Sequence, residues 1–266
     1  MRKKYALHHM TWKEIAEAFK QDPIVLIPLG SMEEHGPHSI TGDFLAASEI
    51  VKQIAERTGA YYLPVIPFGY SELFRGYPGT ISLSPNTLYG LLIDICESLM
   101  EHGVTKMVIF NGHTGNSPII GQAARKIKRE RGIMVASINL WQSIPMEFKK
   151  HLYGNSFNPS GHGGEPLTSV MLHLYPEDMR MDMLAGWRNQ QEVPEWEGFR
   201  IHSPATVETE DIQFQVYLNM EEISRDGILG NPLAASAERG EAIVGELVRR
   251  GTALVEKFTQ ANTIVK

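Results

Sequence analysis

Short apolar segments alternate with longer amphipathic segments along most of this 266-residue chain. The short segments are rich in β-branched residues, as buried strands are, and the longer ones carry apolar residues at helical spacing. The predicted strands are 24–29, 61–66, 106–110 and 133–140, and the predicted helices are 11–20, 44–57, 85–102, 117–131, a helix within 161–174, and 234–258. This alternation favours an α/β fold in which helices cover a mainly parallel sheet.

Composition narrows the class of protein further. Hydrophobic residues make up 42% of the chain and no linker or repeat interrupts it, so we expect one domain over residues 1–266. The net charge of −6 argues against a broad nucleic-acid surface. No segment approaches the ~20 apolar residues that cross a bilayer. The single cysteine, Cys96, lies in an apolar helical segment and is expected in the core, which fits a cytoplasmic protein.

The segment Gly30–His38 follows the first predicted strand directly and is dense in ionisable groups. Ligands of open α/β sheets bind beyond the carboxyl ends of the strands. Glu33 and His35 are two residues apart, so in an extended segment they share a side and can bind one divalent cation, while Asp43 could bridge two. Glu34 points away from them in this picture. Singly, each residue is more often a helix cap or an exposed group; together they favour a metal site.

Two further glycine-rich segments carry histidines. Asn111–Asn116 follows the third predicted strand, whose end should meet the first at one edge of a parallel sheet, and it contains His113. Gly161–Glu165 surrounds a histidine and a glutamate with three glycines. His162 is a candidate general acid or base near neutral pH, and Glu165 is a candidate ligand or base.

Candidate substrate contacts are less sharply defined. Loops as long as 68–84 are more often functional than idle. Trp141 could stack on a ring or pack in the core, and His38 could support a ligand or touch the substrate. Residues 182–222 have weak periodicity and predict surface loops with at most a hairpin. The polar residues of the long loop, which could bind hydroxyl groups or simply be solvated, are Tyr70, Ser71, Glu72, Arg75 and Tyr77.

The ordered set of motifs resembles the creatininase (creatinine amidohydrolase) family. The family patterns are G-S-x-E-Q-H-G-x-H…D, P-G-T-x-S-L, N-G-H-x-G-N, H-A-G-E…T-S and G-x-x-G-D-P…A-x-x-G. The matching segments here are Gly30–His38 with Asp43, Pro78–Leu83, Asn111–Asn116, His162–Glu165 with Thr168 and Ser169, and Gly227–Pro232 with Ala237–Gly240.

The resemblance implies a three-layer α/β/α sandwich with two divalent metals per subunit, of which Zn, Mn and Fe all accept such ligands. It implies ring-shaped oligomers, often hexamers, and a proton-transfer role for His162. Creatininase takes one ligand from a Glu two residues after the ligand histidine, where this chain has Gly115, so Glu165 is the expected replacement. The other ligands that it implies are Glu33, His35, Asp43 as the bridge, and His113.

The chain departs from the family pattern around the expected substrate. Ser39–Gly42 is shorter than the usual spacer, Ser71–Phe74 replaces the common S-x-E-H, and Leu167 replaces the Glu of E-T-S. The metal-site motifs match the family pattern, whereas the segments expected around the substrate do not. We therefore predict the same chemistry on a substrate other than creatinine.

Three functions fit this sequence. The leading hypothesis is a metal-dependent hydrolase that uses metal-activated water to open a cyclic amide, or to cleave a formamide, in a small polar molecule. One alternative is hydrolytic ring opening of an inositol-derived cyclic diketone (a 3-dehydro-scyllo-inosose type of substrate). The other is a non-catalytic protein that binds a metal or ligand on the same fold.

Overall fold

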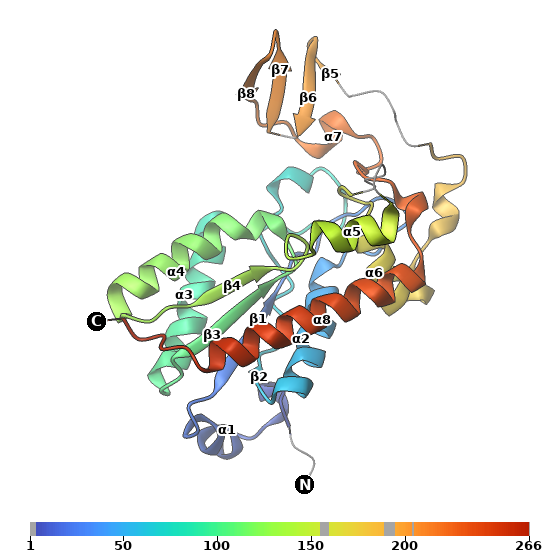
Figure 1. The fold of residues 1–266 in the computed structure, drawn as a ribbon. Helices are drawn as coiled ribbons and strands as arrows, with labels where there is room; N and C mark the ends of the chain where they lie inside the picture. The colour runs from blue at the N-terminus through green and yellow to red at the C-terminus, as the bar shows by residue number, and fades with distance from the viewer. Residues whose placement is uncertain (1–3, 155–159, 189–194, 204, 266) are drawn as a thin grey trace.

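The centre of the molecule is a four-stranded parallel sheet (Figure 1). In this computed structural model, which describes residues 4–154, 160–188, 195–203 and 205–265, the strand order is β2-β1-β3-β4. The strands are β1 (Ile24–Leu29), β2 (Tyr61–Tyr62), β3 (Lys106–Asn111) and β4 (Ala136–Asn139). The second and fourth strands are shorter than predicted. Beyond Tyr62, chain pairing continues only as the isolated bridge from Leu29 to Ile66.

Helices cover both faces of this sheet. Alternate residues of β1 face opposite sides, so that Leu26 packs in one hydrophobic cluster and Ile27 in the other. Figure 1 shows α8 crossing one face of the sheet beside α2, with α3 and α4 behind the other. The three-layer α/β/α prediction is thereby confirmed. The covering helices are α2 (Asp43–Thr58), α6 (Leu167–Leu174) and α8 (Ala237–Thr259) on one face, and α3 (Pro85–Glu101) and α4 (Ser117–Arg131) on the other.

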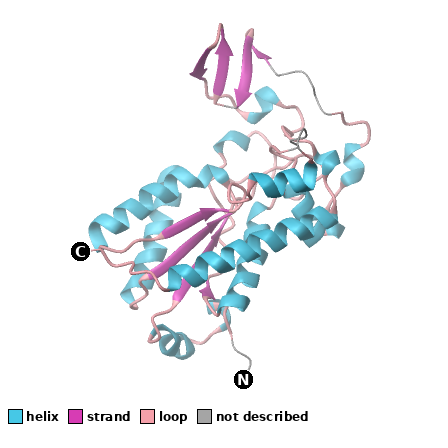
Figure 2. Cartoon of the chain, in the orientation of Figure 1, coloured by secondary structure: helices cyan, strands magenta, loops and turns pink. Residues whose placement is uncertain are grey.

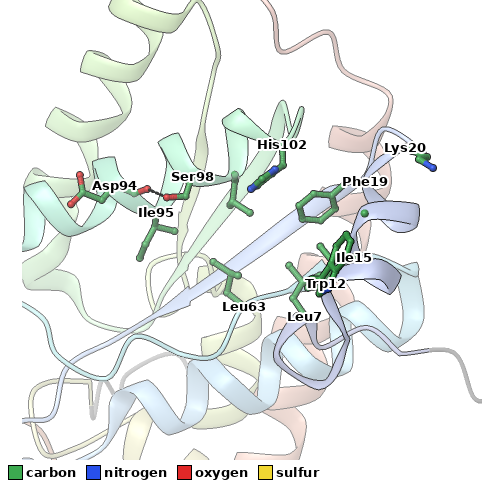
Figure 3. A pocket seen from close by; sticks show the side chains of 12 residues that line it. Leu7, Trp12, Ile15, Phe19, Lys20, Leu63, Asp94, Ile95, Ser98 and His102 are labelled. Atoms are coloured by element: carbon green, nitrogen blue, oxygen red, sulfur yellow. Dashed lines mark hydrogen bonds between the residues drawn. The ribbon is translucent and has the colours of Figure 1, made fainter.

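The first helix, α1 (Trp12–Phe19), lies within the predicted range and begins with a capping box. The Thr11 side chain accepts a hydrogen bond from the backbone of Glu14, whose carboxylate accepts one from the Thr11 backbone. An open apolar groove of about 1000 Å³ lies between α1 and α3, lined by Trp12, Phe19 and Leu63 among others (Figure 3). None of the predicted site residues lines it.

A second sheet stands apart from the parallel one. Figure 2 shows its strands beyond the end of the sandwich, on the side away from the N-terminus. They form an antiparallel sheet in chain order: β5 (Glu195–Trp196), β6 (Phe199–Ser203), β7 (Thr206–Thr209) and β8 (Ile212–Gln215). The expectation of at most one hairpin between residues 182 and 222 was therefore wrong.

The turns of the second sheet explain why its strands are hard to predict. Two-residue hairpin turns of type I′ need positive φ angles at both positions, and Asn-Gly or Asp-Gly is their usual sequence. The two turns of this kind that lie wholly within the described residues are Glu197-Gly198, with φ of 50° and 84°, and Glu210-Asp211, with φ of 47° and 63°. Only Gly198 carries the expected signal.

The remaining helices connect these parts. They are α5 (Met146–Tyr153) and the single-turn α7 (Met220–Ile223), which leads away from the antiparallel sheet. Cys96 is buried within α3, as predicted, and burial raises the pKa of its thiol to about 12. Within the described residues, no helix combines the length and apolarity that a membrane span requires.

Candidate metal centre

The predicted ligands meet at the carboxyl edge of the parallel sheet. β1 and β3 pair in register up to Leu29 and Asn111, so the loops that follow them start side by side. Glu33 lies in the loop after β1, and His113 is the second residue beyond the end of β3. Asp43 is the first residue of α2, which places its carboxylate at the same edge. The parallel topology therefore gathers side chains that are far apart in the sequence.

The ionisable side chains form two groups of three that share one residue. Each group places its candidate donor atoms within 4.8 Å of one another. One comprises Glu33, Asp43 and His113, and the other comprises Glu33, His35 and His162. Glu33 is thus the shared residue, whereas the family resemblance gave that place to Asp43. One oxygen of Asp43 is already engaged, since its Oδ1 accepts a hydrogen bond of 2.6 Å from the backbone of Ser31.

Two histidines of the centre are oriented by backbone carbonyls. His113 donates from Nε2 to the carbonyl oxygen of Tyr70 at 2.9 Å, which leaves Nδ1 3.1 Å from Glu33 Oε1. His35 donates from Nδ1 to the carbonyl oxygen of Glu33 at 3.1 Å, which leaves Nε2 3.5 Å from the same Oε1. A carbonyl only accepts, so it holds the proton on the ring nitrogen that faces it. This arrangement is typical of histidines that bind metals.

His162 repeats the pattern from the third glycine-rich loop. Its Nε2 donates to the carbonyl oxygen of Glu34 at 2.7 Å, and its Nδ1 lies 4.0 Å from Glu33 Oε1. Three imidazoles thus turn one nitrogen each toward a single carboxylate oxygen, with the other nitrogen held by backbone. Imidazole and carboxylate donors at a buried position suit a divalent cation such as zinc or manganese. The residues present therefore fit the metal that the sequence predicts.

The centre perturbs the acidity of its members in opposite directions. Burial raises the pKa of Asp43 to about 6. Burial would also raise the pKa of Glu33, but the charge and hydrogen bond of His113, together with the charges of His35 and His162, outweigh burial and lower that pKa to about 2. Burial, with the charge of His162, lowers the pKa of His35 to about 3. Clustered opposite shifts in buried groups are a physical sign of a functional site.

Glu165 lies outside both groups of donors within the described part of the chain. Its Oε1 accepts a hydrogen bond of 2.5 Å from Ser169 in α6, and Ser169 Oγ in turn accepts one of 3.1 Å from the backbone of Ser236. Burial raises the pKa of the Glu165 carboxyl. Ser169 therefore links the Glu165 carboxylate to the start of α8, and the role of Glu165 as a ligand stays a prediction.

Two predicted substrate contacts are engaged inside the protein. Ser71 is buried and donates from Oγ to Glu33 Oε2 at 2.5 Å, so it fixes the shared carboxylate. His38 is fully buried, and its Nε2 lies 3.3 Å from Thr168 Oγ1 in α6. Both side chains support the loops that carry the centre.

The other predicted contacts pair with residues outside the two groups. Glu72 and Arg75 form an exposed ion pair of 3.0 Å on the long loop. Tyr77 donates from its hydroxyl to the carbonyl oxygen of Ser224. Trp141, packed against the core, donates from Nε1 to the carbonyl oxygen of Gly112. Contact of any of them with a substrate stays a prediction.

Asn116 and Glu34 are site residues whose roles sequence reasoning did not identify. Asn116 is buried; its amide oxygen accepts from the Tyr70 backbone at 2.8 Å and its amide nitrogen donates to the Gly30 carbonyl at 3.1 Å. It connects the loop after β1, the long loop 68–84 and the loop after β3. Its place in a glycine-rich motif was the sequence signal that could have identified it. Glu34 was excluded because adjacent side chains diverge, yet its carboxylate meets His162 from the opposite side.

Known proteins resemble this chain over most of its length. The family model described as "Creatininase: Creatinine amidohydrolase" matches residues 8–255. Creatinine amidohydrolase of Pseudomonas putida is 30% identical over 92% of this chain and 93% of its own length. A 3-dehydro-scyllo-inosose hydrolase of Thermotoga maritima is 27% identical over 94% of this chain and 83% of its own. A mycofactocin precursor peptide peptidase of Mycolicibacterium smegmatis is 28% identical over 85% and 81%.

Solved structures resemble the whole fold. A mutant creatininase complexed with creatine superposes with a TM-score of 0.78 at 29% identity, covering 96% of this chain and 99% of that one. A creatininase described as a Mn form and a mutant described as Zn-Zn type give TM-scores of 0.76 and 0.77 at 29% identity, with the same two coverages. The extent of both kinds of match establishes that the chain belongs to the creatininase family.

Proposed function

We propose that this protein is a metal-dependent hydrolase that cleaves the carbon–nitrogen bond of a cyclic amide, or of a formamide, in a small polar molecule. The observation that carries the proposal is the convergence of three backbone-oriented imidazoles on Glu33 Oε1, at distances of 3.1, 3.5 and 4.0 Å. The hydrolase names of the relatives support the same reaction type.

The first group of donors would hold one divalent cation. Glu33, Asp43 and His113 supply two carboxylates and one imidazole, and Ser71 keeps Glu33 in place. Glu33 and His35 would take part in holding a second cation. When bound, such cations lower the pKa of a coordinated water and stabilise the negative charge that develops on a carbonyl oxygen. The metal would be Zn or Mn, since similar solved structures are described as Zn-Zn and Mn forms.

His162 would move the proton. Its Nδ1 faces Glu33, while its Nε2 is held by Glu34. Burial alone would lower the pKa of His162, but the contact with Glu34 and the neighbouring carboxylates raise it. An imidazole with a raised pKa accepts a proton from water and releases it to the leaving nitrogen. That exchange takes place at Nδ1.

The substrate wall supports an amide other than creatinine. Phe74 stands where members of the family commonly have histidine, and it stacks on His162 with ring centroids 4.0 Å apart. Ring opening of an inositol-derived diketone is the second candidate, supported by 27% identity over 94% of the chain. It needs hydroxyl-binding side chains, and Ser71 and Tyr77 already have partners inside the protein.

Metal content and turnover of His113→Ala test this proposal together. We expect bound zinc or manganese per chain and hydrolysis to fall in parallel, since His113 belongs to the first donor group. His9→Ala, at an exposed position, is the control. Substrates are a panel of lactams, formamides, cyclic diketones of the inosose type and short peptides. Full turnover by metal-free protein would refute the mechanism, and hydrolysis of the diketones alone would replace the substrate class.

A further inference from the structure

Glu34 makes more contacts with the candidate centre than its sequence position suggests. Its Oε1 lies 2.9 Å from His162 Nε2, and its own carbonyl oxygen lies 2.7 Å from that same nitrogen. Its second oxygen, Oε2, accepts a hydrogen bond of 2.7 Å from the backbone of Gly36. The residue is only 6% exposed. The main-chain oxygen of Glu34 therefore accepts the hydrogen bond from His162 Nε2, and its carboxylate lies beside the same nitrogen as an ion-pair partner.

The closing glycine motif makes room for this carboxylate. A Cβ atom at Gly227 would collide with Glu34 Oε2, and Gly227 also has a positive φ of 74°. Glycine is the residue that accepts both conditions. The contact between Glu34 and His162 thus depends on a motif nearly two hundred residues away in the sequence.

Two oxygens close to Nε2 decide which nitrogen of His162 exchanges protons. A hydrogen-bond acceptor with a carboxylate beside it favours a proton on the nitrogen that both face, in the neutral and the charged imidazole alike. Nδ1 is then the nitrogen that gains or loses a proton, and it is the one that faces Glu33 at 4.0 Å. The reverse tautomer would place a lone pair against two oxygens.

The ring plane of His162 is set by stacking. Phe74 lies with its centroid 4.0 Å from the imidazole, and His35 lies at 4.7 Å, each at an interplanar angle of 19°. Phe74 is buried and belongs to the small hydrophobic cluster of the antiparallel sheet, with Ile201 and Val207. The outlying sheet therefore reaches the candidate centre through one aromatic ring.

We propose that Glu34 and Phe74 are positioning residues that hold the Nε2 proton of His162 in place and keep Nδ1 turned toward Glu33. The inference rests on the proposed function, because it assumes that His162 transfers a proton there. It makes Glu34 a determinant of the tautomer and Phe74 a determinant of the ring plane.

Two substitutions at Glu34 test the tautomer. Glu34→Leu removes the carboxylate, and Glu34→Gln keeps its shape but removes the negative charge beside His162 Nε2. We expect kcat to fall by roughly 10–100-fold in the Leu variant and less in the Gln variant, with KM within about twofold. Bound zinc and the melting temperature should match wild type. The exposed Glu17→Gln is the control.

A second measurement does not depend on turnover. In the zinc-loaded protein with ¹⁵N-labelled histidine, the ring shifts of His162 should indicate a protonated Nε2 and an unprotonated Nδ1. Glu34→Leu keeps the main-chain carbonyl at Nε2 and should therefore move both shifts only part of the way toward a mixture. Phe74→Leu should lower kcat several-fold while leaving these shifts in place. Unchanged shifts and kcat in Glu34→Leu would overturn the inference. A lack of hydrolysis in wild type would refute the proposed function and leave the shift measurement valid.

Discussion

The two donor groups of the candidate centre are built in different ways. Glu33, Asp43 and His113 stand at the ends of β1 and β3 and at the start of α2, all within the sandwich that hydrophobic clusters hold on both faces. His162 reaches the second group from a glycine loop, and its stacking partner Phe74 belongs to the cluster of the outlying sheet. The first group is fixed by the main core, whereas the second depends on a smaller and separate one.

The largest expected effects, on bound metal and on kcat, come from removing one residue of each donor group. We expect Asp43→Ala to lose both bound metal and turnover. His162→Ala should keep the cation held by Glu33, Asp43 and His113 and lose about 10²–10⁴-fold in kcat, the usual contribution of general acid–base catalysis. Metal analysis of the purified variants and steady-state kinetics measure both quantities. A complete loss of metal in His162→Ala would identify the histidine as a ligand and erase the distinction.

Matched core substitutions should show that the sandwich core contributes more to the free energy of unfolding than the cluster of the outlying sheet does. Ile109→Ala in β3 should lower the free energy of unfolding by about 2–5 kcal/mol, as large cavities in a main core do. Ile201→Ala in β6 should leave that transition closer to wild type. It should speed hydrogen exchange in residues 195–215 and lower kcat, because Phe74 loses support.

Both effects are read by denaturant unfolding and by hydrogen-exchange mass spectrometry. Equal losses of global stability in the two variants would mean that the outlying sheet and the sandwich unfold as one unit.

The buried histidine His38 should make the stability of the protein depend on pH. His38, in the loop after β1, contacts Thr168 in α6, and burial lowers the pKa of His38 to about 4 from an ordinary 6.5. Below pH 6.5 the unfolded chain takes up a proton that the folded one refuses, so stability falls until about pH 4. The contribution is at most about 3 kcal/mol.

Replacement of this histidine should flatten that dependence. Urea unfolding of wild type and His38→Gln between pH 4 and 7 measures the difference in slope, with the exposed His9→Gln as the control. Parallel curves for wild type and His38→Gln would place the pH dependence in other groups.

The sequence by itself determined the main sheet and the identity of the first donor group. Alternating apolar and amphipathic segments carry the period of strands and helices, and parallel strands bring the residues that follow them to one edge. Glu33, Asp43 and His113 could therefore be predicted from two motifs, without knowledge of distances. The predicted strand boundaries were less accurate: the second strand was predicted over 61–66, but β2 ends at Tyr62, where regular pairing with β1 stops.

Only the tertiary structure decided how the second group is assembled. A contact such as that between Glu34 and His162 joins residues 128 positions apart and has no local periodicity to announce it. The outlying sheet was missed because its turns use Glu197, Glu210 and Asp211 at positive φ, without the usual turn sequences. Which residue is shared by the two groups depends on side-chain directions, and these are set by packing among loops that meet only in the folded chain.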